Sequence, residues 1–159
     1  MSELLKKQNY GVEVEFTGIS RKMAADAVAE IIGTTASRPD HTCYQTRTIQ
    51  DSQGRKWKVM RDSSIHPIRK VGTENMDEYR VEFVTPVLKY EDLETLQAII
   101  RKFREIGGVP HASCGIHIHV DGANHTPSDT NCIPAESSSS SNLLLHCSIR
   151  LNGINTSSS

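Results

Sequence analysis

The sequence lacks an excess of charge of either sign and lacks any long apolar segment. Its 159 residues contain 18 Lys and Arg against 19 Asp and Glu, which gives a formal net charge of −1. This balance gives no electrostatic reason to expect a nucleic acid or an anionic membrane as a partner. No stretch is apolar over enough residues to cross a bilayer, so we expect no membrane partner.

Several motifs of other protein classes are also missing. The four cysteines form no C-x-x-C pair and no zinc-ribbon spacing: Cys43, Cys114, Cys132 and Cys147. The first residues lack the apolar run of a signal peptide, so we expect reduced thiols in a cytoplasmic protein. There is no glycine-rich phosphate loop, and Ser63 and Ser64 lack the context of a hydrolase nucleophile. The length suits one domain with a core of its own.

A short strand pattern near the start contains two glutamates on one face. Residues Tyr10–Phe16 alternate apolar and polar side chains, which places Glu13 and Glu15 together opposite an apolar face. Two carboxylates on one strand face repel each other, so we expect positive charge over that face. The alternative is an edge strand whose glutamates only face water.

Two later segments have matching chemistry. Tyr79–Pro86 predicts a strand with Glu82 on its polar face, and Gly115–Val120 predicts a strand with His117 and His119 on one face. Oxygen ligands suit Mg²⁺ or Mn²⁺, and a mixture with imidazole favours Mn²⁺ or Zn²⁺. The pattern therefore predicts a site for a divalent cation, and the alternative is a polar face hydrogen-bonded across the sheet.

The remaining segments predict two helices and a hairpin. The first helix spans Arg21–Ile32, with Ser20 as its N-cap and Gly33 as its end. Its apolar stripe contains Met23, Ala24, Ala27, Val28, Ile31 and Ile32. A hairpin follows from Cys43 to Arg61, and the second helix runs from about Glu91 to Ile106.

This order of elements predicts an α+β fold, with a mostly antiparallel sheet and two helices on one of its faces. The uncovered face of the sheet would then hold the polar residues of the three strands, which are Glu13, Glu15, Glu82, His117 and His119. Between the hairpin and the strand predicted at Tyr79–Pro86, we expect the loop His66–Asp77 to be mobile.

The composition changes after Gly122. From Asn124 to Ser159 the charged residues are Asp129, Glu136 and Arg150, and Ser137–Ser141 is a serine run. No helical or strand period persists there. We therefore divide the chain into a domain of residues 1–122 and a Ser/Thr/Asn-rich tail of residues 123–159. The tail is either disordered or, as we favour, translated out of frame from near Pro127, which sequencing of the gene would test.

Four segments together resemble the amidoligase family. They are Gly11–Phe16, Trp57–Ile65, Val81–Pro86 and Cys114–Val120, in this order and spacing. The family belongs to the carboxylate–amine ligases, which include glutamine synthetase and glutamate–cysteine ligase. The resemblance covers about Asn9–His125, the N-terminal half of such an enzyme, and implies part of a glutamine synthetase-like catalytic fold.

The resemblance implies ATP-dependent formation of an amide bond from small-molecule or peptide carboxylates and amines. The carboxylate takes the γ-phosphoryl group to become an acyl phosphate, which the amine then attacks. By position in the motifs, Glu13 and His117 are implied ligands of a cation near the nucleotide. Glu15 and Glu82 are implied ligands of a second cation near the substrate carboxylate.

Three more residues are implied to line the site, and none is assigned as catalytic. His119 shares the cavity, Asp62 occupies the D-x-S-I position, and Arg80 would meet a phosphate or carboxylate or would pair with Glu82. Family members have a later half with further acidic ligands and arginines, so we expect this chain to be a truncated ligase with weak or no activity. The alternative is a non-catalytic metal- or nucleotide-binding remnant, and a metal-dependent hydrolase fits less well. The oligomeric state is open, although related enzymes often form homo-oligomers.

Overall fold

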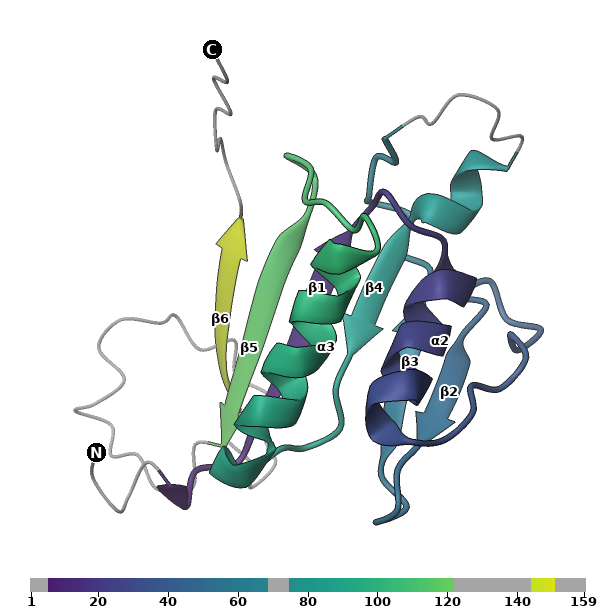
Figure 1. The fold of residues 1–159 in the computed structure, drawn as a ribbon. Coiled ribbons are helices and arrows are strands. Elements are labelled where there is room, and N and C mark those ends of the chain that lie inside the picture. Colours follow the sequence, from purple (N-terminus) through teal and green to yellow (C-terminus); the bar gives the residue numbers. More distant parts are fainter. Residues whose placement is uncertain (1–5, 69–74, 122–143, 151–159) are drawn as a thin grey trace.

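One antiparallel sheet forms the centre of the protein (Figure 1). The computed structural model describes residues 6–68 and 75–121, and the backbone of residues 144–150. Neighbouring strands are antiparallel in the order β2-β3-β4-β1-β5-β6. The strands are β1 (Tyr10–Phe16), β2 (Arg47–Gln50), β3 (Lys56–Met60), β4 (Val81–Val84), β5 (Gly115–Asp121) and β6 (Leu144–Arg150).

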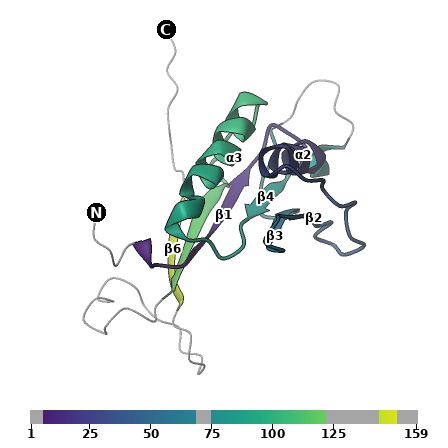
Figure 2. The ribbon, with the colours of Figure 1, turned by 60° about the horizontal axis from the view of Figure 1, so that its bottom comes forward.

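Both α-helices of the described residues cover the same face of this sheet. Helix α2 (Arg21–Ile32) packs on β2 and β3, and α3 (Leu93–Glu105) lies beside it over the centre of the sheet. Figure 2 shows the two helices together on one side of the strands. The predicted α+β class, with two helices on one face of an antiparallel sheet, is confirmed. Among the described residues, no helix is both long enough and apolar enough to cross a bilayer.

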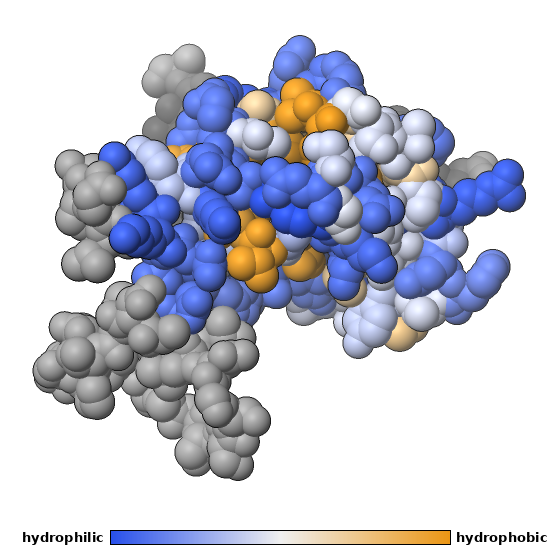
Figure 3. Space-filling view, turned by 90° about the horizontal axis from the view of Figure 1, so that it is seen from below, coloured by the Kyte–Doolittle hydropathy of each residue, from blue (hydrophilic) through white to orange (hydrophobic). Residues whose placement is uncertain are grey.

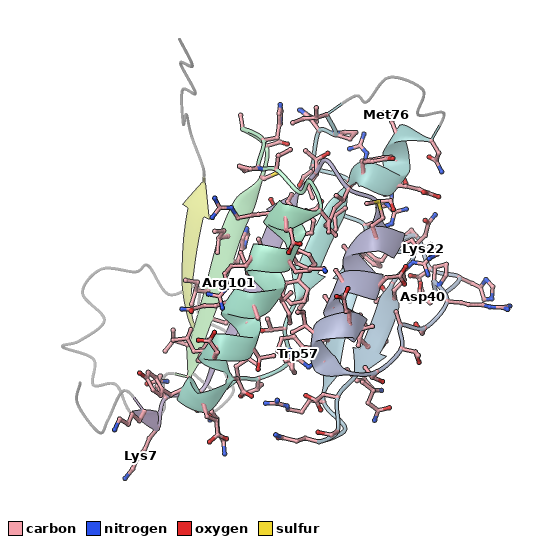
Figure 4. All side chains as sticks on the ribbon, in the orientation of Figure 1. Lys7, Lys22, Asp40, Trp57, Met76 and Arg101 are labelled. Carbon is pink, nitrogen blue, oxygen red and sulfur yellow. The ribbon has the colours of Figure 1, made fainter. Side chains whose placement is uncertain are left out.

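Aromatic side chains join the helices to the sheet. The Phe103 ring of α3 lies 4.8 Å from the Phe16 ring and 5.2 Å from the Phe83 ring, measured between centroids. Trp57 is 1% exposed, stacks 6.1 Å from Phe83 and lies beneath the helices in Figure 4. The core therefore forms on the helix-covered face, and the opposite face of the sheet is left for polar side chains.

The two ends of α2 are where the sequence predicts them. The Ser20 hydroxyl accepts a hydrogen bond from the Met23 amide at 3.2 Å, and Gly33 ends the helix with φ of 78°. The apolar stripe is partly wrong, because Met23 and Ile31 are 43% and 37% exposed. Alanines Ala25 and Ala29 are buried instead, since their short side chains let the helix lie close to the sheet.

Two predicted boundaries shift because short 3₁₀ turns precede the elements. Residues Met76–Tyr79 form such a turn, in which the Asn75 side chain accepts from the Asp77 amide at 3.2 Å, so β4 begins at Val81 rather than Tyr79. Likewise, a turn at Tyr90–Asp92 precedes α3. Side-chain caps of this kind compete locally with strand and helix hydrogen bonds.

The structure also differs from the prediction in the tail. Leu144–Arg150 forms β6 and pairs with β5, although the sequence there shows no strand period. Pairing at a sheet edge uses backbone groups, which any sequence supplies, so periodicity did not reveal it. The rest of the tail, residues 123–143 and 151–159, and positions 69–74 of the predicted mobile loop lie outside the described residues. The division at residue 122 and the frame hypothesis stay predictions.

The surface away from the core is mostly polar. Seen from below, hydrophilic residues dominate and hydrophobic ones form small separate patches (Figure 3). The exposed apolar side chains are scattered: Tyr44, Val87 and Val109 lie in different loops, and Met23 and Ile31 lie on α2. Scattered single apolar residues are normal for a protein surface.

Candidate functional site

The register of the three central strands brings the predicted site residues to one face. Glu13 on β1 lies opposite His117 on β5, and Glu15 on β1 lies opposite Glu82 on β4. Residues directly opposite each other in an antiparallel pair project to the same side of the sheet. These four side chains therefore share the face that α2 and α3 leave uncovered, as the sequence predicts.

The two histidines stand against the two glutamates of β1. His117 Nδ1 lies 3.8 Å from Glu13 Oε2, and its Nε2 lies 3.6 Å from Glu15 Oε1. His119 Nε2 lies 3.2 Å from Glu13 Oε1. Imidazole nitrogens thus face the carboxylates of β1, and both histidines belong to the same cluster.

A group of three carboxylates forms the other half of the cluster. Oxygens of Glu15, Asp62 and Glu82 all lie within 4.8 Å of one another. Asp62 enters from the segment after β3, where Met60 is paired with Glu82. Its position is fixed locally, because its Oδ1 accepts a hydrogen bond from the Ser64 amide at 2.7 Å. Oxygens at this spacing can bind one divalent cation.

Burial, together with nearby negative charge, raises the pKa of two of these carboxyls. Burial, followed by the charges of Glu13, Asp62 and Glu15, raises the pKa of Glu82 to about 7. Burial also raises the pKa of Glu15, although the hydrogen bond that its Oε2 accepts from the Gly115 amide at 2.7 Å opposes the shift. The cluster is therefore short of positive charge, which a bound cation would supply.

Pockets open at both ends of the cluster. One has a volume of about 630 Å³ and is lined by Glu15, Asp62 and His117 together with residues from two loops. The other has a volume of about 380 Å³ and is lined by His119, Tyr10 and residues near the β4 end. The cluster thus lies between two spaces, each large enough for part of a small molecule.

Arg80 does not lie where strand parity predicts it. Because β4 begins only at Val81, Arg80 lies outside the strand, and its side chain turns to the loop that contains Asp62. Its Nη1 donates to the Ser63 carbonyl at 2.7 Å and also to the Ile65 carbonyl, and its Nε lies 3.4 Å from Asp77 Oδ1. Arg80 therefore holds the loop rather than pairing with Glu82, and it acts on the site indirectly.

Asp77 is a residue that sequence reasoning missed. Its carboxylate accepts from Arg61 Nε at 2.8 Å and lies 3.5 Å from Arg21 Nη2, in addition to its contact with Arg80. Arg21 is almost fully buried, at 4% exposure. One carboxylate thus connects the start of α2, the end of β3 and the loop of Asp62, and no local pattern reports such a meeting of distant segments.

Sequence reasoning also missed His66, His111 and Ser113, which line the larger pocket. His111 and Ser113 lie just before the H-x-H strand, and His66 follows the D-x-S-I segment. Their nearness in sequence to two recognised motifs is the one signal that could have indicated them.

Comparison with known proteins gives one family. The model of the family described as "Putative amidoligase enzyme" matches residues 6–143. No curated protein and no solved structure matches the chain. The match includes β1 to β5 and extends beyond His125, where the resemblance in the sequence was expected to end. The predicted likeness to a glutamine synthetase-like fold stays a prediction.

Proposed function

This chain belongs to the amidoligase family, and we propose that it joins a carboxylate to an amine by an ATP-dependent reaction with divalent cations as cofactors. The family membership supports a ligase in general. The dependence on ATP and metal is our inference from the site.

The observation that supports the proposal is the convergence of carboxylates and imidazoles on one face of the sheet. Oxygens of Glu15, Asp62 and Glu82 lie within 4.8 Å of one another, and His117 lies between Glu13 and Glu15. The carboxylate oxygens suit Mg²⁺ or Mn²⁺, and the imidazole nitrogens move the preference of the mixed donor set toward Mn²⁺. The raised pKa of Glu82 is a second sign of fit, because burial and the nearby negative charges both disfavour its ionised form, and a bound cation would offset them.

In this proposal Glu13 and His117 hold one cation, and Glu15 and Glu82 hold another. Bound there, the cations would neutralise charge on the phosphates and on the substrate carboxylate. The protein's own part is to hold these side chains in place on rigid strands. Hydrogen bonds to Glu15 from Gly115 and to Asp62 from Ser64 fix two of the carboxylates before any substrate arrives.

The chemistry is phosphoryl transfer followed by acyl transfer. A carboxylate oxygen of the substrate attacks the γ-phosphorus of ATP. The bond between the γ-phosphorus and the β,γ-bridging oxygen breaks, and ADP leaves. The amine then attacks the carbonyl carbon of the acyl phosphate, loses a proton, and displaces inorganic phosphate. Both steps depend chiefly on alignment and on neutralised charge, which the open face and its two adjacent pockets are suited to provide.

ADP release is the direct test. We would measure it with Mg²⁺ or Mn²⁺ over a panel of amino acids and peptides, with hydroxylamine as the amine, because attack on an acyl phosphate then gives a detectable hydroxamate. Glu13→Gln and His117→Ala are expected to lower turnover by about 100-fold or more. Glu94→Gln is the matched control, since its exposed side chain pairs with Arg101 on the helix-covered side.

The results of this assay distinguish a ligase from a non-catalytic remnant. Turnover that is unchanged in Glu13→Gln would contradict the proposal. Metal binding without any turnover, abolished by His117→Ala, would favour the non-catalytic remnant. The same assay tests the prediction that this chain is a weak enzyme.

A further inference from the structure

The larger pocket contains polar groups that the metal cluster does not use. Besides Glu15, Asp62 and His117, its walls include His66, His111 and Ser113 from the loops on either side of the cluster. Its volume of about 630 Å³ exceeds the space that a bound carboxylate alone would fill. The pocket can therefore hold the body of a substrate whose reacting carboxylate meets the carboxylate cluster.

Hydrogen bonds from Ser113 assign the tautomer of the His111 ring. The Ser113 backbone amide donates to His111 Nδ1 at 3.2 Å, so Nδ1 is an acceptor. The Ser113 hydroxyl lies 3.0 Å from the same nitrogen. Assigned from this network, the neutral ring has its proton on Nε2. Within the described residues no hydrogen bond occupies Nε2, so this N–H group of a pocket-lining ring is available to a ligand.

The same serine connects the two loops that form the pocket wall. Its hydroxyl oxygen accepts a hydrogen bond from the His66 backbone amide at 2.8 Å. The His66 and His111 rings lie 6.2 Å apart, measured between centroids. Ser113 thereby fixes the position of His111 relative to the segment that follows Asp62, and the donor is held in place before a substrate binds.

We infer that His111 determines substrate specificity by donating its Nε2–H to an oxygen of the acyl substrate that is remote from the reacting carboxylate. The inference rests on the proposed function, because it assigns this pocket to the acyl substrate. The pocket adjoins Glu15 and Asp62, the side of the cluster assigned to that substrate. The substrate class is carboxylic acids with a second oxygen acceptor, either another carboxylate or an amide carbonyl, and simple monocarboxylates are poor ligands.

Binding of three probes tests this without turnover. Glutarate offers a second carboxylate, N-acetylglycine offers an amide carbonyl, and butyrate offers neither. We would measure their affinities by calorimetry with Mn²⁺ present, and record the imidazole nitrogen signals of His111 by NMR. We expect at least one of the first two probes to bind the wild type about tenfold more tightly than butyrate does and to shift the Nε2 signal.

Two variants separate a role in recognition from a structural role. His111→Leu removes the donor and is expected to lose the tenfold preference, while His111→Gln places an amide N–H near the same position and keeps most of it. Preference for glutarate alone identifies a second carboxylate, and preference for N-acetylglycine alone identifies an amide carbonyl. Equal affinity for all three probes, or no detectable binding of any, overturns the inference. So does an unchanged preference in His111→Leu.

Results that contradict the role of His111 can be told apart from results that contradict the proposed ligase activity. An inactive protein that still prefers an acceptor-bearing probe would contradict the ligase and leave the role of His111 supported. An active ligase whose use of glutarate and butyrate is unaffected by His111→Leu would support the ligase and contradict the role of His111. Thermal melting of both variants checks that they are folded.

Discussion

Glu82 is the carboxyl group of the site whose pKa is raised to about 7. Its carboxyl group is surrounded by Glu13, Glu15 and Asp62, and its pKa is raised from 4.5 to about 7. At low pH the group is protonated in both the folded and the unfolded protein and has no effect on stability. Between about pH 4.5 and 7 the unfolded protein ionises this carboxyl while the folded protein keeps it protonated, because burial and the neighbouring carboxylates disfavour its charge, so stability falls over this range and is lowest above about pH 7.

Glu82→Gln is therefore expected to stabilise the metal-free protein above pH 7, and to have little effect below pH 4.5. The gain is on the order of 1 kcal/mol, because solvent partly screens the side chain. Urea unfolding in the presence of a chelator at both pH values measures it. Equal stability of the two proteins above pH 7 would show that Glu82 is not in a repulsive environment.

Metal binding should reverse the order of stability of these two proteins. Mn²⁺ binds the ionised carboxylate, so we expect it to raise the melting temperature of the wild type more than that of Glu82→Gln. The effect on the wild type should grow as the pH rises through about 7. Thermal melting over a series of Mn²⁺ concentrations is the measurement, and Ca²⁺ tests the preference between cations. A similar response of both proteins would place the cation elsewhere.

At the scale of elements, the segment after β3 depends on contacts with the 3₁₀ turn that precedes β4. Arg61 and Arg80 both contact Asp77, and Arg80 also holds the Ser63 carbonyl at 2.7 Å. This segment contains Asp62, so the arrangement fixes a carboxylate of the cluster through residues that do not touch the cluster themselves. Asp77 is thus a positioning residue for the site.

Asp77→Ala is expected to cost about 2 kcal/mol of stability, because it leaves the buried Arg21 guanidinium without its carboxylate. It should also weaken Mn²⁺ binding through the displaced Asp62. Asp26→Ala is the control, since the Lys22–Asp26 pair is exposed on α2 and should be worth less than about 0.5 kcal/mol. Mn²⁺ affinity that survives in Asp77→Ala would show that the loop keeps its place without the arginine contacts.

Two glycines at positive φ, each in a turn next to a secondary-structure element, differ in the space around them. Gly18 has φ of 91°, and an added Cβ would lie 2.4 Å from the Gly107 carbonyl oxygen. Gly33 has φ of 78°, and an added Cβ would meet nothing within 4 Å. Gly33→Ala should cost about 1 kcal/mol from backbone strain alone, and Gly18→Ala clearly more. Chemical unfolding compares them, and equal losses would mean that the turn at Gly18 relaxes freely.

For the whole molecule, Phe103 joins helix α3 to the two strands beside it. Its ring contacts Phe16 on β1 and Phe83 on β4, and the side chain is 3% exposed. Phe103→Ala is expected to cost about 3–5 kcal/mol, a large part of the stability of a domain of this size. Trp57, the single tryptophan, is buried in the same core and reports unfolding by its fluorescence.

A control for this variant is Val87→Ala, because that side chain is 66% exposed and should change stability by less than about 0.5 kcal/mol. Fluorescence of Trp57 and far-UV circular dichroism should give the same midpoint, since the helices and the sheet share one core. Separate midpoints would show that α2 with β2 and β3 unfolds independently of the rest.

The sequence by itself determined the elements that alternate regularly and the face to which their polar residues belong. The period of two in Tyr10–Phe16 and in Gly115–Val120 placed Glu13, Glu15, His117 and His119 on the uncovered face, because a strand has only two faces. Ser20 and Gly33 fixed the ends of α2, because capping is a local interaction.

Only the tertiary structure decided what depends on contacts between distant segments. The meeting of Asp62 with Glu15 and Glu82, the contacts of Arg21 and Arg61 with Asp77, and the Ser113 link between two loops all join residues far apart in the chain. Strand β6 was equally hidden, since edge pairing uses backbone groups that every residue possesses. Periodicity reports the face of an element, whereas the neighbours of that face follow from strand order and register.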